Sequence, residues 1–165
     1  MMSRCAAAAT LVLCVYLEAV EWLDLAPWTT SFKVTHGNNG EQMLDVIVGF
    51  IMVAMVVALW RGGRLSTLTC TGLLSVFIWL QVTSWWVPYF AGADARWKRV
   101  YAKWYAETVQ ILPSSPSHLA PPAKVVVLQT ILLIAFGLSL SATLAAFASH
   151  RRGINSETGG PGGWR

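Results

Sequence analysis

Apolar residues gather into four long runs along the chain, and polar or turn-forming segments separate them. The runs cover about residues 5–25, 43–60, 65–90 and 125–149. Each approaches or exceeds the ~20 residues that a helix needs to cross a hydrocarbon core of ~30 Å. Hydrocarbon offers no partner to backbone N–H and C=O groups, so such runs must be helical. The pattern predicts an all-α integral membrane protein whose four transmembrane helices form a bundle.

The composition argues against an ordinary soluble domain. Of the 165 residues, 55% are hydrophobic and 12% are charged, which is too apolar for a typical soluble protein. The formal net charge is +4, but Lys and Arg stand at the ends of apolar runs and in one short segment, without a continuous basic face. We therefore expect a lipid bilayer around the chain and no nucleic-acid partner.

The organisation predicted is one transmembrane domain, residues 1–150, followed by a tail. The first run follows Arg4 as a signal peptide would, but no A-x-A cleavage pattern follows it, so we expect a retained helix. Cys5, Cys14 and Cys70 lie in or at the edge of apolar runs without a C-x-x-C pair, which favours packing roles over redox or metal chemistry. The tail, residues 151–165, is rich in glycine, and we expect it to be disordered.

Arginines predict the orientation in the membrane. Four crossings put both termini on one side, and the short "RGGR" link, residues 61–64, lies on that side with Arg4, Arg151 and Arg152. By the positive-inside rule this is the cytoplasmic face. We expect a multi-pass protein of a bacterial cytoplasmic membrane with residues 26–42 and 91–123 outside. The rule is weakened by cations on the outer side, which are Arg96, Lys98, Arg99, Lys103 and Lys124.

The second outer loop contains "SWWVPYFAGADARWKRVYAKWYAE", residues 84–107, in which aromatic and basic residues alternate. Aromatic and apolar residues recur at spacings of three or four, with cations opposite, which predicts an amphipathic interfacial helix over about residues 95–112. Asp94 would cap this helix and Pro113 would end it. The helix could lie among lipid headgroups or pack on the outer mouth of the bundle. In the first case the membrane-interface residues are Trp85, Trp86, Tyr89, Trp97, Tyr101 and Trp104.

Small and polar residues recur at spacing four on three of the predicted helices. Because the hydrophobic effect does not drive helices together in lipid, close approach along such ridges supplies the packing contacts. We expect the ridges to form helix contacts. They are Ala6, Thr10, Cys14 and Glu18 on the first helix, Thr67, Thr71 and Ser75 on the third, and Gly137, Ser141, Ala145 and Ser149 on the fourth.

Acidic and amide residues fall at a common depth in the predicted bundle. At a rise of 1.5 Å per residue, Glu21, Asp45 and Gln81 lie roughly 24 to 26 Å from the inner arginines and Glu18 about 21 Å. Ionisable residues inside a membrane usually face the bundle interior or water and mark functional sites. The alternative is that the first helix ends near Glu18 and its acids are solvated.

No sequence motif discloses an enzyme. A nucleophile motif, a phosphate loop, a dinucleotide fingerprint and HExxH are all missing. His36 and His118 could join Glu41 at a metal, but their spacing matches no ligand pattern, so we expect no metal and no cofactor. The leading hypothesis is a structural or interaction protein, either an accessory subunit or a homo-oligomer. The alternatives are a proton- or cation-coupled carrier using Glu18, Glu21, Asp45 and Gln81, and, more weakly, an interfacial enzyme acting on a lipid or quinone.

Overall fold

The computed structural model describes residues 1–23, 25–29, 39–105 and 107–158, with residues 39, 41 and 150–158 given by their backbone only. In this part of the chain every regular element is helical, apart from one isolated bridge between Gln110 and Pro122. Four helices are long and apolar enough to cross a membrane, which confirms the predicted all-helical fold at that level. These spans are Met2–Trp22, Gln42–Arg61, Arg64–Ala91 and Ala123–Ser149.

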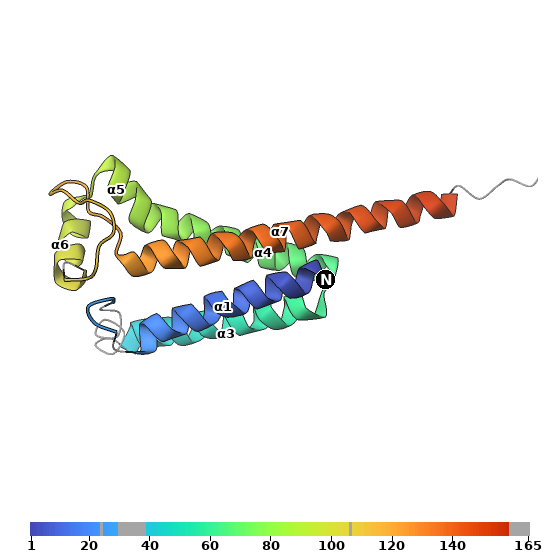
Figure 1. The fold of residues 1–165 in the computed structure, drawn as a ribbon, viewed down its shortest axis with the longest axis horizontal. Helices are drawn as coiled ribbons and strands as arrows, with labels where there is room; N and C mark the ends of the chain where they lie inside the picture. Colours follow the sequence, from blue (N-terminus) through green and yellow to red (C-terminus); the bar gives the residue numbers. More distant parts are fainter. Residues whose placement is uncertain (24, 30–38, 106, 159–165) are drawn as a thin grey trace, which may run out of the picture.

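The four long helices run alongside one another, and two short helices lie at one end (Figure 1). That end, with α5, α6 and their loops, is called the cap end below. The other, the link end, holds the N-terminus and the turn at Gly62 and Gly63. The elements are α1 (Met2–Trp22), α3 (Asn39–Arg61), α4 (Arg64–Gln81), the π-helical turn η1 (Val82–Trp86), α5 (Val87–Ala91), α6 (Ala95–Trp104) and α7 (Ala123–Thr158).

Helix α1 packs between α3 and α7, and α7 also packs on α4, whereas the contact between α3 and α4 is smaller than these three. The interior is apolar, while large side chains such as Phe50 and Leu65 stay exposed on the outside. Extensive exposed apolar surface is unusual for a soluble monomer and suits a lipid environment. The core consists of Ala6, Ala7, Leu13, Cys14, Met52, Met55, Leu59, Cys70, Leu74, Leu132 and Ala135.

The predicted ridges of small residues are only partly correct. On α1, Ala6, Thr10 and Cys14 are buried, as expected. On α4, Thr67 and Thr71 are buried but Ser75 is exposed. The ridge predicted for α7 is wrong, because its residues stay exposed or half-buried and Ser141 and Ser149 bond to carbonyls of their own helix. The packed face of α7 is instead formed by Leu132, Ala135, Ser139, Ala142 and Thr143.

Two predicted boundaries differ from the structure. Helix α6 ends at Trp104 instead of near residue 112, because Val109 N–H bonds to Pro27 O and Gln110 pairs with Pro122, so tertiary pairing replaces the last helical turns. At the C-terminal end, α7 continues as helix to Thr158, past the predicted end of the fourth run at residue 149. A single glycine in a helix costs only about 1 kcal/mol, and residues 159–165 lie outside the described part.

Candidate polar site at the cap end

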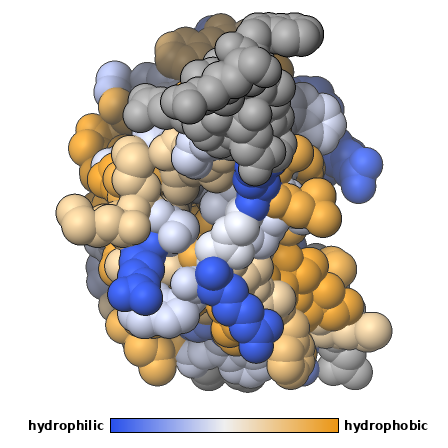
Figure 2. All heavy atoms as spheres, turned by 90° about the vertical axis from the view of Figure 1, so that its right-hand side faces the viewer, coloured by the Kyte–Doolittle hydropathy of each residue, from blue (hydrophilic) through white to orange (hydrophobic). Residues whose placement is uncertain are grey.

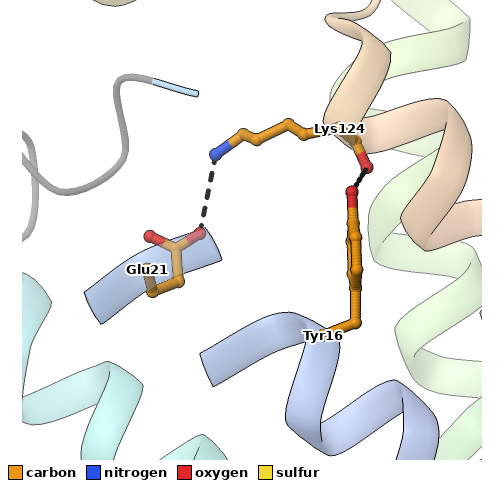
Figure 3. A network of polar contacts seen from close by, with 3 residues as sticks. All are labelled: Tyr16, Glu21 and Lys124. Carbon is orange, nitrogen blue, oxygen red and sulfur yellow. Dashed lines mark hydrogen bonds and ion pairs between the residues drawn. The ribbon is translucent and has the colours of Figure 1, made fainter. Parts of the chain in front are cut away.

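An ion pair at the cap end joins the first and last long helices. Lys124 Nζ lies 3.5 Å from Glu21 Oε1, and the two side chains are only 9% and 22% exposed. Tyr16 Oη donates a hydrogen bond of 3.1 Å to Lys124 O, so two contacts tie α1 to the start of α7 (Figure 3). The ammonium group also lies 5.8 Å from the ring centre of Tyr105, just beyond α6. Lys124 therefore contacts α1 and the cap at once.

Sequence reasoning did not predict the role of Lys124, which it counted among the outer loop cations. The sequence does contain a signal for this role, which is the position of Lys124 in its helix. Lys124 is in the first turn of α7, where the helix macrodipole disfavours a cation. A lysine placed there, at the depth of several acids, indicates a carboxylate partner.

Glu18 sits against a glycine of the neighbouring helix. A Cβ atom added at Gly49 would lie 2.5 Å from Glu18 Oε1, so α3 offers the carboxyl group a space that only glycine leaves. This oxygen is buried and accepts no hydrogen bond from the residues that the structure describes. A groove of about 290 Å³ between α1 and α3 runs past the carboxyl group and is lined by Cys14, Glu18, Trp22, Val46, Gly49, Phe50 and Val53.

The structure brings three of the four predicted polar residues together. Asp45 and Glu21 act electrostatically on Glu18, and Asp45 also acts on Lys124. Helix α1 runs to Trp22, so both of its glutamates lie on the helix and not beyond an earlier end. The site is thus a cluster of three carboxyl groups and one ammonium group.

Gln81 lies on α4, which packs on α7, and in the described part of the chain no hydrogen bond joins it to the acids. Its Oε1 is buried without a described donor, as is Oε1 of Gln129 on α7. The common depth predicted from residue counting therefore does not produce a common contact.

Toward the link end, the buried polar side chains are mostly hydroxyl groups with partners. Thr10 Oγ1 donates to Ala6 O at 2.9 Å. Thr71 Oγ1 lies 2.8 Å from Ser139 Oγ and 3.0 Å from Thr143 Oγ1, which connects α4 to α7. The described carboxyl groups all lie at or beyond the cap end of the bundle, so the charged cluster does not continue through the core.

The aromatic residues of the cap pack largely on protein. Tyr101 is 5% exposed, and its hydroxyl group donates to Ala120 O at 2.8 Å and accepts from Gln110 Nε2 at 2.7 Å. Burial raises the pKa of Tyr101. Trp85 is also buried and meets the rings of Trp97 and Tyr105 edge to face, at 5.2 and 5.0 Å between centroids. These contacts match the alternative in which the helix packs on the bundle.

The remaining predicted interface residues are half-buried. Trp86 stacks on Phe90, Tyr89 Oη donates to Pro113 O, and Lys103 Nζ lies 4.4 Å from the ring centre of Trp104. The cations Arg96, Lys98, Arg99 and Lys103 point away from the buried side of α6 and are exposed.

The histidines form no recognisable centre in the described part of the chain. His118 is exposed and its Nδ1 lies 2.8 Å from Tyr89 O. His36 and the Glu41 side chain lie outside the described residues. No three His, Cys, Asp or Glu side chains that the structure places could hold a metal ion together.

Comparison with known proteins adds no family. No protein-family model, curated protein or solved structure matches the chain. In the site at the cap end, the buried ammonium group of Lys124 pairs with Glu21. Such an ion pair can fasten two helices together, and ionisable groups inside a membrane usually face the bundle interior or water.

Proposed function

We propose that the protein is an integral membrane protein of the interaction type, an accessory subunit or homo-oligomer, and that its cap presents the contact surface. The observation that carries this proposal is the exposed row of cations on α6. Arg96, Lys98, Arg99 and Lys103 are exposed, and no carboxylate among the described side chains forms an ion pair with any of them. A concentrated basic surface of this kind favours an anionic partner.

Contacts within the cap fix the helix that carries these cations before any partner binds. Asp94 Oδ1 accepts a hydrogen bond of 2.6 Å from Trp97 N–H and so caps α6, while Tyr101 anchors the opposite side of the helix. A rigid surface loses less conformational entropy on binding. In the orientation expected from the arginines, with the cap outside, the positive-inside rule does not account for these cations.

The experiment begins with membrane placement and then tests the partner. The protein should stay in the membrane pellet after alkaline carbonate extraction, and release into the supernatant would contradict the proposal. Tagged protein purified from native membranes in mild detergent should retain a partner at low salt and lose it at high salt, since exposed charges are screened. Neutralising α6 (R96Q/K98Q/R99Q/K103Q) should abolish retention, whereas R4Q/R61Q, at the link end, should not. Equal retention by both variants would overturn the role of α6.

A second candidate, a proton- or cation-coupled carrier, is supported by Glu18. Its buried Oε1 has no described hydrogen-bond partner and stands beside Asp45, in the part of the bundle where a titrating carboxyl group could act. Purified protein in vesicles loaded with a pH-sensitive dye should then speed dissipation of a proton gradient. E18Q and D45N should lose this activity, and E107Q, a matched exposed control in the cap, should keep it. A rate no faster than that of protein-free vesicles would dismiss the carrier.

A further inference from the structure

An apolar groove opens between α3 and α4, on the side of the bundle opposite the α1–α7 contact. Its volume is about 720 Å³, within the range of ~300 to 1,000 Å³ typical of ligand sites. Residues at helical spacing line both walls, with Ile51, Ala54 and Ala58 on α3, and Leu65, Thr69 and Leu73 on α4. Met55 and Cys70 form the floor, where Cys70 Sγ lies 3.8 Å from Met55 O.

The groove arises from the turn and from small side chains. Gly62 and Gly63 have φ values of 72° and 116°, a region that favours glycine, and they reverse the chain within two residues. The helices therefore start close together at the link end. Ala54, Ala58 and Thr69 are then too small to fill the space between them. The α4 wall from Leu65 to Leu73 is about 12 Å long at helical rise, so the groove is an elongated channel along the helices.

One end of this channel is basic. Arg64 lines the groove at the link end and is half-buried, and exposed Arg61 and Arg4 lie on the same end of the bundle. Figure 2 shows this end, where hydrophilic side chains stand among a mainly apolar periphery. Every carboxylate whose side chain is described lies at the cap end or in the outer loop, so no described acid neutralises Arg64.

We propose that the α3–α4 groove binds an anionic phospholipid, with one acyl chain along the apolar channel and the phosphate group at Arg64. The apolar walls match a hydrocarbon chain, and the guanidinium group presents a planar pair of donors that suits phosphate oxygens. This positive charge, which no carboxylate among the described side chains neutralises, selects an anionic headgroup over a zwitterionic one. This inference rests on the proposed membrane placement but not on the proposed partner of the cap.

The test uses full-length protein equilibrated in vesicles of equimolar phosphatidylglycerol and phosphatidylcholine, then released into mild detergent for native mass spectrometry. Wild type should retain a single phospholipid, mainly phosphatidylglycerol. Ala54→Trp, which fills the groove, should abolish retention. Val57→Trp, exposed on α3 but outside the groove, should not. Size-exclusion profiles and circular dichroism show whether both variants are folded.

A charge variant keeps the test decisive if Ala54→Trp fails to fold. Arg64→Gln should lower the preference for phosphatidylglycerol by about tenfold, the loss expected for one charge-assisted contact. Arg61→Gln, adjacent in sequence but outside the groove, should leave the preference unchanged. Equal effects of the two arginine variants, or no retained lipid in wild type, would overturn the proposal.

A dimer that Ala54→Trp dissociates would assign the groove to a second copy of the chain and would also overturn it. In either case the carbonate extraction and the cap variants still decide the proposed function separately.

Discussion

The contact between α1 and α7 and the contact between α3 and α4 follow opposite rules. Helices α3 and α4 are joined by two glycines, yet their contact is small and leaves a groove between them. Helices α1 and α7 are separated by most of the chain, yet they pack closely and share the Glu21–Lys124 pair. A short connection brings the ends of two helices together. Small buried residues and polar contacts between helices determine which helix faces pack closely.

The largest expected effect comes from removing the ammonium group of the α1–α7 contact. Lys124→Met removes the ammonium group that pairs with Glu21. Breaking a buried pair by removing one partner costs ~3 to 5 kcal/mol, but Glu21 is 22% exposed, so we expect a loss of roughly 2 to 3 kcal/mol of stability. Thermal unfolding in detergent measures it. Adding Glu21→Gln should recover much of the loss, and a double variant no more stable than Lys124→Met would contradict this account.

The four long helices can be predicted from the sequence, but the faces through which they pack cannot. Length and hydropathy predict the four long helices, since an apolar run of about 20 residues in lipid has few other conformations. They do not predict which face of α7 packs. Small residues at spacing four occur on the outer side of α7 around Ser141 and also on its buried side around Ser139. Only the positions of α1 and α4 determine which of these two sides packs.

For the candidate site too, the sequence predicts positions along the helices but not contacts between them. Depth along the helices places Glu18, Glu21 and Asp45 at a similar level, because rise per residue is nearly constant. Depth says nothing of direction around the helix axis, so it does not tell whether Gln81 on α4 faces these acids. The early end of α6 and the α3–α4 groove depend on contacts between segments far apart in sequence, which local patterns do not contain.

The second prediction compares an alanine-to-leucine substitution in the packed core with the same substitution in the α3–α4 groove. Ala135 is fully buried in the core, so Ala135→Leu should overpack it and lower stability by about 1 to 3 kcal/mol. Ala54 lines the groove, where Ala54→Leu has room and should change stability by less than about 0.5 kcal/mol. Unfolding temperatures of the two variants in one detergent test the difference, and similar losses would mean that the groove is closed in solution.

The third prediction compares two glycines in helix interiors. Nothing lies within 4 Å of a Cβ atom added at Gly72, so Gly72→Ala should stabilise the protein by about 0.5 to 1 kcal/mol through helix propensity. At Gly49 the added Cβ would lie 2.5 Å from Glu18 Oε1, so Glu18 must move and the gain should disappear. Chemical denaturation of both variants measures the pair. An equal gain at both sites would show that Glu18 does not depend on Gly49.

The smallest expected effect concerns the hydroxyl contacts between α4 and α7. Thr71→Val keeps the branched shape but removes the oxygen that lies near Ser139 and Thr143. Hydrogen bonds between membrane helices contribute about 0.6 kcal/mol on average and ~1.7 at most, so we expect a loss of roughly 1 kcal/mol. Ser75→Ala is the matched control, because Ser75 is exposed and bonds only to Thr71 O of its own helix. If both variants shift the unfolding temperature equally, the hydroxyl contacts do not hold α4 against α7, and packing of Leu74 and Leu132 alone accounts for the closed contact.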